Sequence, residues 1–127
     1  MDEILILQAE VLKTLASPRR LEILHALADG PMDVGNLAKA IHATQPNVSQ
    51  HLGVLRSAGL VEAERDGRLV RYSLSDADVM VACALMRAVL ERRLTRLGQM
   101  AAIAGLAPAP GRAIARRPLG NPSVSNP

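Results

Sequence analysis

The chain has 127 residues, about the length of one domain with tails and too short for two, and its 49% hydrophobic content includes a single aromatic residue, Tyr72. No apolar run reaches the roughly 18–20 residues that cross a bilayer, and the first residues are acidic where a signal peptide is basic, so we expect a soluble, cytoplasmic protein. The formal net charge of +3 is unevenly divided along the chain. Residues 1–86 carry 8 Lys and Arg against 11 Asp and Glu, whereas residues 87–127 carry 7 Lys and Arg against 1 Asp or Glu. The overall basic charge is therefore weak evidence for nucleic-acid binding.

Two helices are predicted at the start of the chain. Apolar residues recur at roughly helical spacing over residues 4–15, which predicts an amphipathic helix that ends near residue 16. Ser17 followed by Pro18 predicts the start of the second helix, because serine caps free amides and proline fits the first helical turn. This helix is expected over about Pro18–Ala28, where the sequence Asp-Gly-Pro ends it.

A helix-turn-helix arrangement is predicted next. Asp33 can cap a short third helix that runs through Ile41. Thr44 can cap a fourth helix that has Pro46 in its first turn and is terminated by Gly59. Two short helices joined by a tight turn, with polar residues outward on the second, form this motif. The inward stripe of the fourth helix is expected to be Val48, Leu52 and Leu55.

The sequence pattern then changes period and predicts a β-hairpin. Residues 60–74 contain two partly apolar runs separated by Asp66 and Gly67, a dipeptide that tolerates the positive φ of a tight turn. With the helices on either side, this predicts a mainly α-helical fold with a small β-hairpin. The expected architecture is a winged helix-turn-helix of element order α-α-α-α-β-β-α.

A long last helix and a tail complete the predicted organisation. The helix is expected from Ser75 or Asp76 to about Leu97 or beyond, and over residues 79–90 it is apolar on nearly every face. Such a helix needs a second surface, which predicts a homodimer formed through the first and last helices. Residues 1–105 are therefore expected to form one domain, and residues 106–127, rich in Pro, Gly, Ser and Asn, a disordered basic tail.

Four stretches of the sequence stand out as an ensemble. They are Ser-Pro-Arg-Arg-Leu from residue 17, Gln-Pro-Asn-Val-Ser-Gln-His-Leu from residue 45, Leu-Arg-Ser-Ala-Gly-Leu-Val from residue 55 and Gly-Arg-Leu-Val-Arg-Tyr-Ser-Leu from residue 67. Together they resemble the ArsR/SmtB family of bacterial repressors, over residues 12–97. The resemblance implies a symmetric dimer of winged-helix subunits that binds an inverted-repeat operator near a promoter and is released when an inducer binds.

The residues of the fourth helix and the hairpin independently support DNA binding, and a polar solvated helix face with a charged hairpin is the alternative that they leave open without the resemblance. Short amide and hydroxyl side chains at the exposed start of a helix suit base edges in a major groove. The predicted base-reading residues are Gln45, Asn47, Ser49 and Gln50. Contacts to the DNA backbone or minor groove are predicted for Thr44, His51, Arg56, Arg65, Arg68 and Arg71. For His51 the alternative is a partly buried scaffold residue.

Positions that bind metal in members of the resembling family carry other residues here. Arsenic-sensing members have two cysteines in the third helix, where this chain has Asp33 and Gly35. In zinc- and cobalt-sensing members the last helix carries two pairs of ligands; Asp76 and Asp78 match the early pair, and apolar and basic residues fall near the later one. A carboxylate pair without imidazole partners is a poor transition-metal site. We therefore expect no metal site and no cofactor, and we interpret both aspartates as first-turn residues of the last helix, favourable to the helix dipole.

His25 and Cys83 are the remaining sensor candidates. Redox- and sulfide-sensing relatives pair a cysteine of the second helix with one of the last; His25 takes the first position here, and Cys83 lies in the apolar stripe of the last helix. A joint metal or oxidant site is one hypothesis. A buried, inert thiol beside an unrelated, half-buried histidine is the other. A single cysteine also excludes an internal disulfide.

Two further classes of function complete the sequence-based expectations. An enzyme lacks support, because the sequence shows no nucleophile with a spaced base, no phosphate loop and no clustered acids. The alternative to a repressor is a protein-interaction or dimerisation module whose Arg-rich end binds nucleic acid or acidic partners nonspecifically. The expected partners are double-stranded operator DNA and a second copy of the chain, with an inducer that the sequence does not identify. The arginines of the Arg-rich end are Arg92, Arg93, Arg96, Arg112, Arg116 and Arg117.

Overall fold

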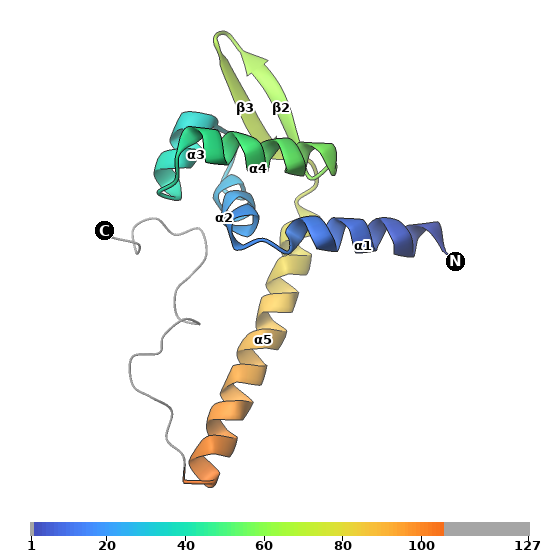
Figure 1. The fold of residues 1–127 in the computed structure, drawn as a ribbon, viewed down its shortest axis with the longest axis vertical. Coiled ribbons are helices and arrows are strands. Elements are labelled where there is room, and N and C mark those ends of the chain that lie inside the picture. Colours follow the sequence, from blue (N-terminus) through green and yellow to red (C-terminus); the bar gives the residue numbers. More distant parts are fainter. Residues whose placement is uncertain (1, 106–127) are drawn as a thin grey trace. The chain divides into compact units, whose positions relative to one another are not determined.

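The computed structural model describes residues 2–105, which form two units, residues 2–77 and residues 78–105 (Figure 1). The predicted fold class, mainly α-helical with the order of a winged helix-turn-helix, is confirmed. The predicted tail, residues 106–127, lies outside the described residues. The elements in chain order are α1 (Glu3–Leu15), α2 (Pro18–Leu27), β1 (Met32–Asp33), α3 (Val34–Ala40), α4 (Gln45–Ser57), β2 (Val61–Asp66), β3 (Leu69–Leu74) and α5 (Asp78–Ile103).

Side-chain caps fix the starts of α2, α3 and α4. Ser17 Oγ accepts a hydrogen bond from a backbone N–H of the first turn of α2 at 3.3 Å. Asp33 Oδ1 does the same for α3 at 2.8 Å, and Thr44 Oγ1 for α4 at 3.3 Å. Each cap satisfies an amide that has no partner inside the helix and contributes about 1 kcal/mol. The three caps are those that the sequence predicts.

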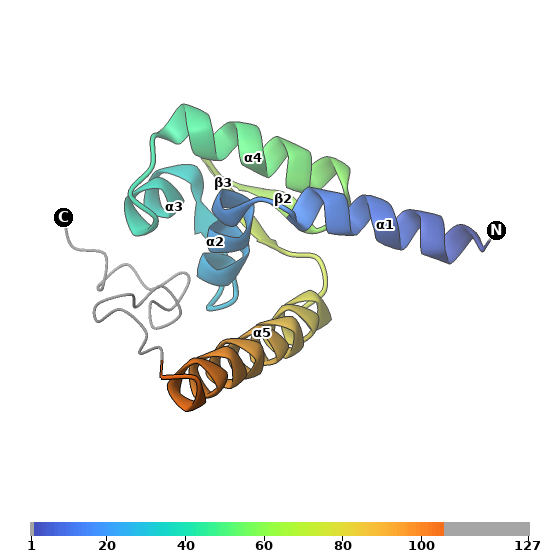
Figure 2. The same ribbon diagram turned by 60° about the horizontal axis from the view of Figure 1, so that its bottom comes forward.

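The core of the first unit is aliphatic and lies where α4 packs against α2, α3 and β2. Figure 2 shows α4 lying across α2 and α3. The predicted stripe of α4 is confirmed, because Val48, Leu52 and Leu55 are at most 1% exposed. Burying each such side chain is worth about 1.5–3 kcal/mol, so this stripe holds α4 firmly with its opposite side in solvent. Other fully buried side chains are Ile23, Leu24 and Leu37.

The sheet has three strands in the order β1-β3-β2, one more than predicted. The short strand β1 pairs antiparallel with β3, Met32 opposite Tyr72 and Asp33 opposite Arg71. Two residues are too few to show an alternating pattern in sequence, so β1 depends on its partner strand. It ties the segment before α3 to the hairpin.

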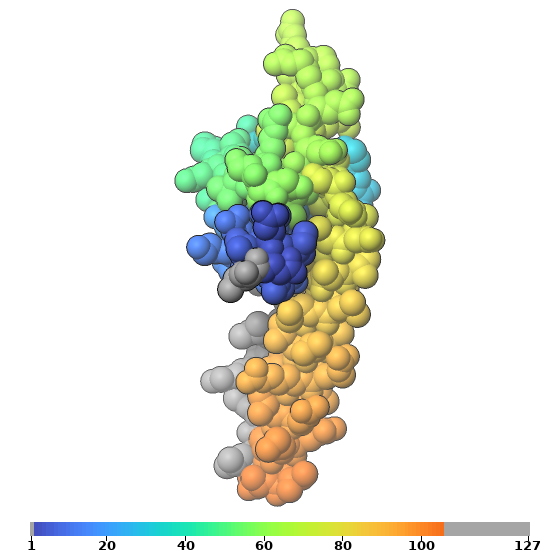
Figure 3. All heavy atoms as spheres, turned by 90° about the vertical axis from the view of Figure 1, so that its right-hand side faces the viewer, coloured from blue at the N-terminus to red at the C-terminus, as the bar shows by residue number. Residues whose placement is uncertain are grey.

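The hairpin turn lies one residue later than predicted. Asp66 is the last residue of β2 and pairs with Leu69, so the two turn residues are Gly67 and Arg68 rather than Asp66 and Gly67. Gly67 has a φ of +65°, a conformation that glycine adopts without the steric cost of a side chain. The turn and the adjoining strand ends form the protruding wing, which stands clear of the rest of the first unit (Figure 3).

The long helix α5 begins later than expected. It starts at Asp78, so only this aspartate lies in the first turn; Asp76 precedes the helix, and its predicted role within the first turn is wrong. The helix continues to Ile103, in agreement with the predicted end at about Leu97 or beyond. None of the residues of α5, which the structure describes throughout, is buried. Within residues 2–105, no helix has the length and apolar character needed to span a membrane.

Candidate nucleic-acid interface

The solvent side of α4 carries three of the four predicted base-reading residues. Gln45, Ser49 and Gln50 are exposed, and so is Thr44, the residue that caps the helix. The buried stripe on the other side of α4 fixes how the helix is rotated about its axis. Short amide and hydroxyl groups are thereby presented on a rigid element, as base reading requires.

Asn47 is placed differently from the other three. Its backbone N–H donates to Thr44 Oγ1 at 3.3 Å, and its side chain is only half exposed. Its Oδ1 atom is buried and has no hydrogen-bond partner within the described part of the chain. An unpaired buried acceptor costs about 1–3 kcal/mol. The burial of Oδ1 means that the carbonyl end of this side-chain amide is turned into the domain.

Gly35 lies beside the side chains of Asp33 and Gln45. A Cβ atom at this position would lie 3.6 Å from Gln45 Nε2 and 3.3 Å from Asp33 Oδ1. The second distance is tight, so the absence of a side chain leaves room for the aspartate that caps α3.

The three wing arginines do not lie on one face. Side chains alternate along a strand, and paired residues of neighbouring strands share a face. The register pairs Glu64 with Arg71, so Arg65, one residue further along β2, lies on the opposite face. Arg71 shares its face with Asp66 as well, and its Nε donates to Asp66 Oδ2 at 3.0 Å. Arg68 stands in the turn at the tip of the wing and is exposed.

Arg56 lies in the last turn of α4 and is exposed. It lines a hollow with residues of β2 and β3, at the end of the helix away from the capped first turn. The basic residues predicted to contact the DNA backbone thus lie beyond the base-reading turn, at the far end of α4 and along the wing.

His51 is held inside the domain by Arg20. Its ring is half exposed, and its Nδ1 accepts a hydrogen bond from Arg20 Nε at 3.3 Å. Burial lowers the pKa of His51 below its usual value, and the positive charges of Arg20 and Arg19 lower it further. A neutral imidazole is thereby favoured at neutral pH, and it attracts a phosphate less than an imidazolium does. This geometry favours the scaffold alternative for His51.

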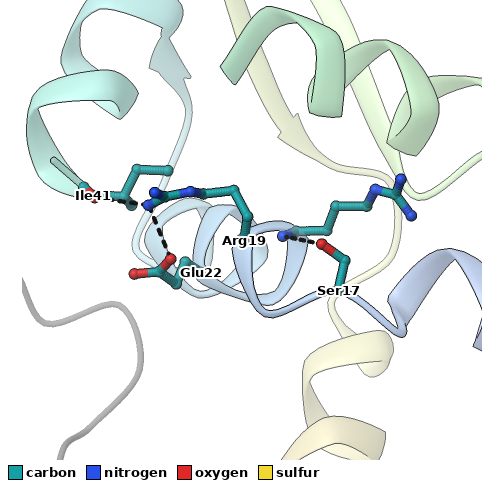
Figure 4. Close-up of polar contacts among 5 residues, drawn as sticks. Ser17, Arg19, Glu22 and Ile41 are labelled. Atoms are coloured by element: carbon teal, nitrogen blue, oxygen red, sulfur yellow. Dashed lines mark hydrogen bonds and ion pairs between the residues drawn. The ribbon is translucent and has the colours of Figure 1, made fainter. Parts of the chain in front are cut away.

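Sequence reasoning missed the role of the two arginines that follow Ser17 and Pro18. Arg19 Nη1 donates to the carbonyl oxygen of Ile41, at the end of α3, and to Glu22 Oε1, both at 3.1 Å (Figure 4). Arg20 bonds to α1 and α4. The stretch Ser-Pro-Arg-Arg-Leu carries both residues, and the bonds of Arg19 to Glu22 and of Arg20 to Thr14 are local. The other two partners, Ile41 and His51, lie 22 and 31 residues further along the chain, so the sequence offers no signal for these two contacts.

The sensor candidates His25 and Cys83 belong to different units of the structure. Asp33 caps α3, which accounts for an aspartate at this position. His25 is half buried, and its Nδ1 lies 2.8 Å from the carbonyl oxygen of Leu21, in hydrogen-bond distance within α2. Cys83, on α5, is a free, half-buried thiol whose pKa is raised by burial, which makes the reactive thiolate scarcer. Residues 2–105 contain no group of three or more His, Cys, Asp or Glu placed to hold a metal ion. A joint His25 and Cys83 sensor stays a prediction.

Comparison with known proteins identifies the family of the chain. Residues 17–63 match the family described as bacterial regulatory protein, arsR family. The HTH-type transcriptional regulator Rv0081 of Mycobacterium tuberculosis (strain H37Rv) is 43% identical over 90 residues, 70% of this chain and 79% of that protein. The HTH-type transcriptional repressor SmtB of the same strain is 46% identical over 74 residues, 58% of this chain and 55% of that protein.

Solved structures agree with this match. The crystal structure of Rv0081 superimposes with a TM-score of 0.67 at 40% identity, covering 76% of this chain and 97% of that one. The solution structure of the homodimeric winged helix-turn-helix DNA-binding domain of Mb0332 from Mycobacterium bovis gives a TM-score of 0.66 at 38% identity, covering 73% of this chain and 86% of that one. This chain therefore belongs to the ArsR family of bacterial regulatory proteins.

Proposed function

We propose that this protein is a sequence-specific DNA-binding transcription regulator that reads its operator with α4. The observation that carries the proposal is the exposure of Gln45, Ser49 and Gln50 on a helix whose opposite stripe is fully buried. A capped, rigid helix with short amide and hydroxyl groups on its free side suits the major groove. Membership of a family of regulatory proteins supports the same function. Its proposed activity is the binding of operator DNA rather than catalysis, in the cytoplasm.

The proposed contacts fall into two sets. Gln45, Ser49 and Gln50 read bases, with Asn47 in a secondary place because its Oδ1 is turned into the domain. The sequence-independent contacts come from exposed hydroxyl and guanidinium groups, which position the protein on phosphates or in the minor groove. We leave Arg71 and His51 out of this second set, because one is paired with a carboxylate and the other with Arg20. The second set is Thr44, Arg56, Arg65 and Arg68.

We propose that the working form is a homodimer joined through α1 and α5. Neither helix has a buried residue in the single chain, although both are rich in large aliphatic side chains. Exposed apolar surface of this extent marks an association surface, and the relative Mb0332 is described as homodimeric. A two-fold dimer presents two copies of α4, so the operator should be an inverted repeat. The exposed apolar residues include Ile4, Leu5, Leu7 and Leu12 on α1 and Val81, Leu85, Met86, Val89, Leu90, Leu94, Leu97 and Met100 on α5.

We propose repression as the sense of regulation, with an inducer that releases the operator. The support is the relative SmtB, which is named a transcriptional repressor. A dimer seated on a promoter blocks access by occupying the DNA, so release on inducer binding restores transcription. The inducer is left open, since neither Cys83 nor His25 has a feature that commits it to sensing.

A second candidate function is nonspecific binding of nucleic acid by the basic part of α5. The observation that favours it is the exposure of Arg92, Arg93 and Arg96 within little more than one helical turn. Clustered arginines attract a phosphate backbone without reading sequence. In this case the winged domain would serve chiefly for association.

Selection of bound duplexes from a random pool separates the two functions. The regulator predicts enrichment of one inverted repeat, with enrichment lost in the variant Gln45→Ala/Gln50→Ala and kept in the matched charge variant Arg92→Ala/Arg96→Ala. The second function predicts no enriched sequence and loss of retention in the arginine variant alone. A pool without any enriched motif would contradict the proposed regulator.

A further inference from the structure

One guanidinium connects three helices of the first unit. Arg20 Nη1 donates to the carbonyl oxygen of Thr14, in the last turn of α1, at 2.9 Å. Its Nε donates to His51 Nδ1, in the middle of α4, at 3.3 Å. The backbone N–H of Arg20 donates to Ser17 Oγ at 3.3 Å, which fixes where the side chain starts. Because the guanidinium is rigid and planar, its two bonds constrain each other.

The connection lies beside a proposed base-reading residue. A groove separates α1 from α4 and is lined by Leu7, Val11 and Thr14 on one side and by Gln50 and Val54 on the other. Thr14 supplies the carbonyl that Arg20 binds, and Gln50 is the chain neighbour of His51. The rotation and depth of α4 near Gln50 are thus set partly by a bond that also holds α1.

We infer that Arg20 is a positioning residue for DNA reading: through His51 it holds α4 at a fixed placement relative to α1 and α2. This inference rests on the proposed function of α4. In this role Arg20 itself does not contact DNA. It acts because its bond to His51 keeps the turn that bears Ser49 and Gln50 in place, so its loss lowers discrimination between sequences more than it lowers attraction to DNA in general.

The bond requires one tautomer of His51. Nδ1 can accept from Arg20 only when it carries no proton, so a neutral ring must have its proton on Nε2. The charged groups that act on this ring are Arg20 and Arg19, both on α2, and both oppose its protonation. The bond is therefore compatible only with the Nε2–H tautomer, which can be observed by nitrogen chemical shifts without DNA.

The first test is a double-mutant cycle on the specificity ratio, the dissociation constant for random duplex divided by that for the selected site. Arg20→Met and His51→Leu should each lower this ratio about tenfold, with affinity for random duplex unchanged, and the double variant should be no worse than either single one. Independent, multiplying losses would overturn the inference. Equal loss on selected and random DNA, with a shallower salt dependence, would also overturn it, because Arg20 would then be a phosphate contact.

Two matched variants sharpen the result. Arg19→Met removes an arginine of the same turn that bonds to Ile41 rather than to His51. Any reduction of the specificity ratio in Arg19→Met should therefore multiply with the reduction in His51→Leu. His51→Asn keeps an acceptor near the position of Nδ1 and should retain the specificity ratio to within about threefold. A His51→Asn protein as poor as His51→Leu would contradict the positioning role.

The second test is the imidazole tautomer, read from long-range proton–nitrogen spectra of the full chain. The wild type should show His51 as the Nε2–H tautomer, and Arg20→Met should shift the Nδ1 signal, because the hydrogen bond to this nitrogen is lost, while Arg19→Met leaves it in place. A wild-type ring protonated on Nδ1 overturns the inference. If Arg20→Met does not fold, the wild-type spectrum and the two His51 variants still decide the question. If the wild type shows no sequence selectivity, the proposed function is contradicted. If the wild type is selective but His51 is protonated on Nδ1, only the positioning role of Arg20 is contradicted.

Discussion

Arg71 and Asp66 form an ion pair on one face of the wing, with Arg71 Nε 3.0 Å from Asp66 Oδ2. Glu64 lies directly across from Arg71 on the same face, and Arg65 lies on the opposite face. A phosphate that approaches Arg71 therefore also meets two carboxylates, which oppose it. The arginines of the wing are unequal in their surroundings, although their spacing in sequence gives no sign of this.

Replacements of the three wing arginines should not all change the salt dependence of DNA binding by the same amount. Arg68→Ala should lower affinity for every DNA sequence and reduce the slope of log Kd against log salt by about one unit, because one phosphate contact is lost. Arg65→Ala should behave in the same way. Arg71→Ala is the matched control and should change the slope by less than half as much, since its charge is already paired. Anisotropy titrations at several salt concentrations measure the slopes, and an Arg71 effect as large as that of Arg68 would refute the assignment of faces.

The reading face of α4 predicts a loss confined to specific DNA. Gln50→Ala should weaken binding to the selected site by about 1–3 kcal/mol and relax the preference at one base position, because an exposed amide that pairs with a base edge is removed. Ser57→Ala, at the exposed far end of the same helix, should leave the preference unchanged. Repeated selection with each variant gives the preferences, and an unaltered motif for Gln50→Ala would show that the reading face lies elsewhere.

If the apolar side chains of α5 form the dimer surface, introducing a charge among them should give a monomeric protein. Leu94 is 52% exposed in the single chain, so Leu94→Glu costs little within one subunit but places a charge in the proposed dimer surface. Sedimentation should give the mass of one chain, with strongly reduced affinity for the inverted repeat. Leu69→Glu is a matched control, because this wing residue is 49% exposed and lies outside the proposed surface. A dimeric Leu94→Glu protein would exclude this part of α5 from the interface.

The lowered pKa of His51 predicts the direction of a pH effect on stability. The unfolded chain protonates this group near its usual pKa of about 6.5, and the folded chain only at lower pH. The contribution of His51 is therefore fully present above pH 6.5 and is lost as the pH falls through the folded pKa. Denaturant unfolding at pH 8 and at pH 5 should show a smaller loss of stability in His51→Asn than in the wild type. Equal losses would mean that His51 does not titrate differently on folding.

Local signals predicted the helix starts and the orientation of α4. Ser17, Asp33 and Thr44 are caps whose chemistry acts within three residues, and Val48, Leu52 and Leu55 repeat at the helical period. Such features can be read from sequence because their partners are near in the chain. They were enough to place Gln45, Ser49 and Gln50 on the exposed side.

Features that depend on distant partners could not be predicted in this way. Strand β1 exists because Met32 meets Tyr72, forty residues later. The bond between Arg20 and His51 joins residues 31 positions apart. Because Asp66 pairs with Leu69, the turn consists of Gly67 and Arg68 and not of the predicted Asp66 and Gly67. The position of a turn depends on strand register as well as on the turn residues.

The most direct test of a sequence-reading regulator is the specificity ratio of the wild-type protein at physiological salt. Competition titrations should measure Kd for the selected inverted repeat and for random duplex of equal length in the same buffer. A sequence-reading regulator should bind the selected site at least about a thousandfold more tightly, the lower range for specific DNA-binding proteins. A ratio near one would contradict this function and leave nonspecific, charge-driven binding as the activity of the protein.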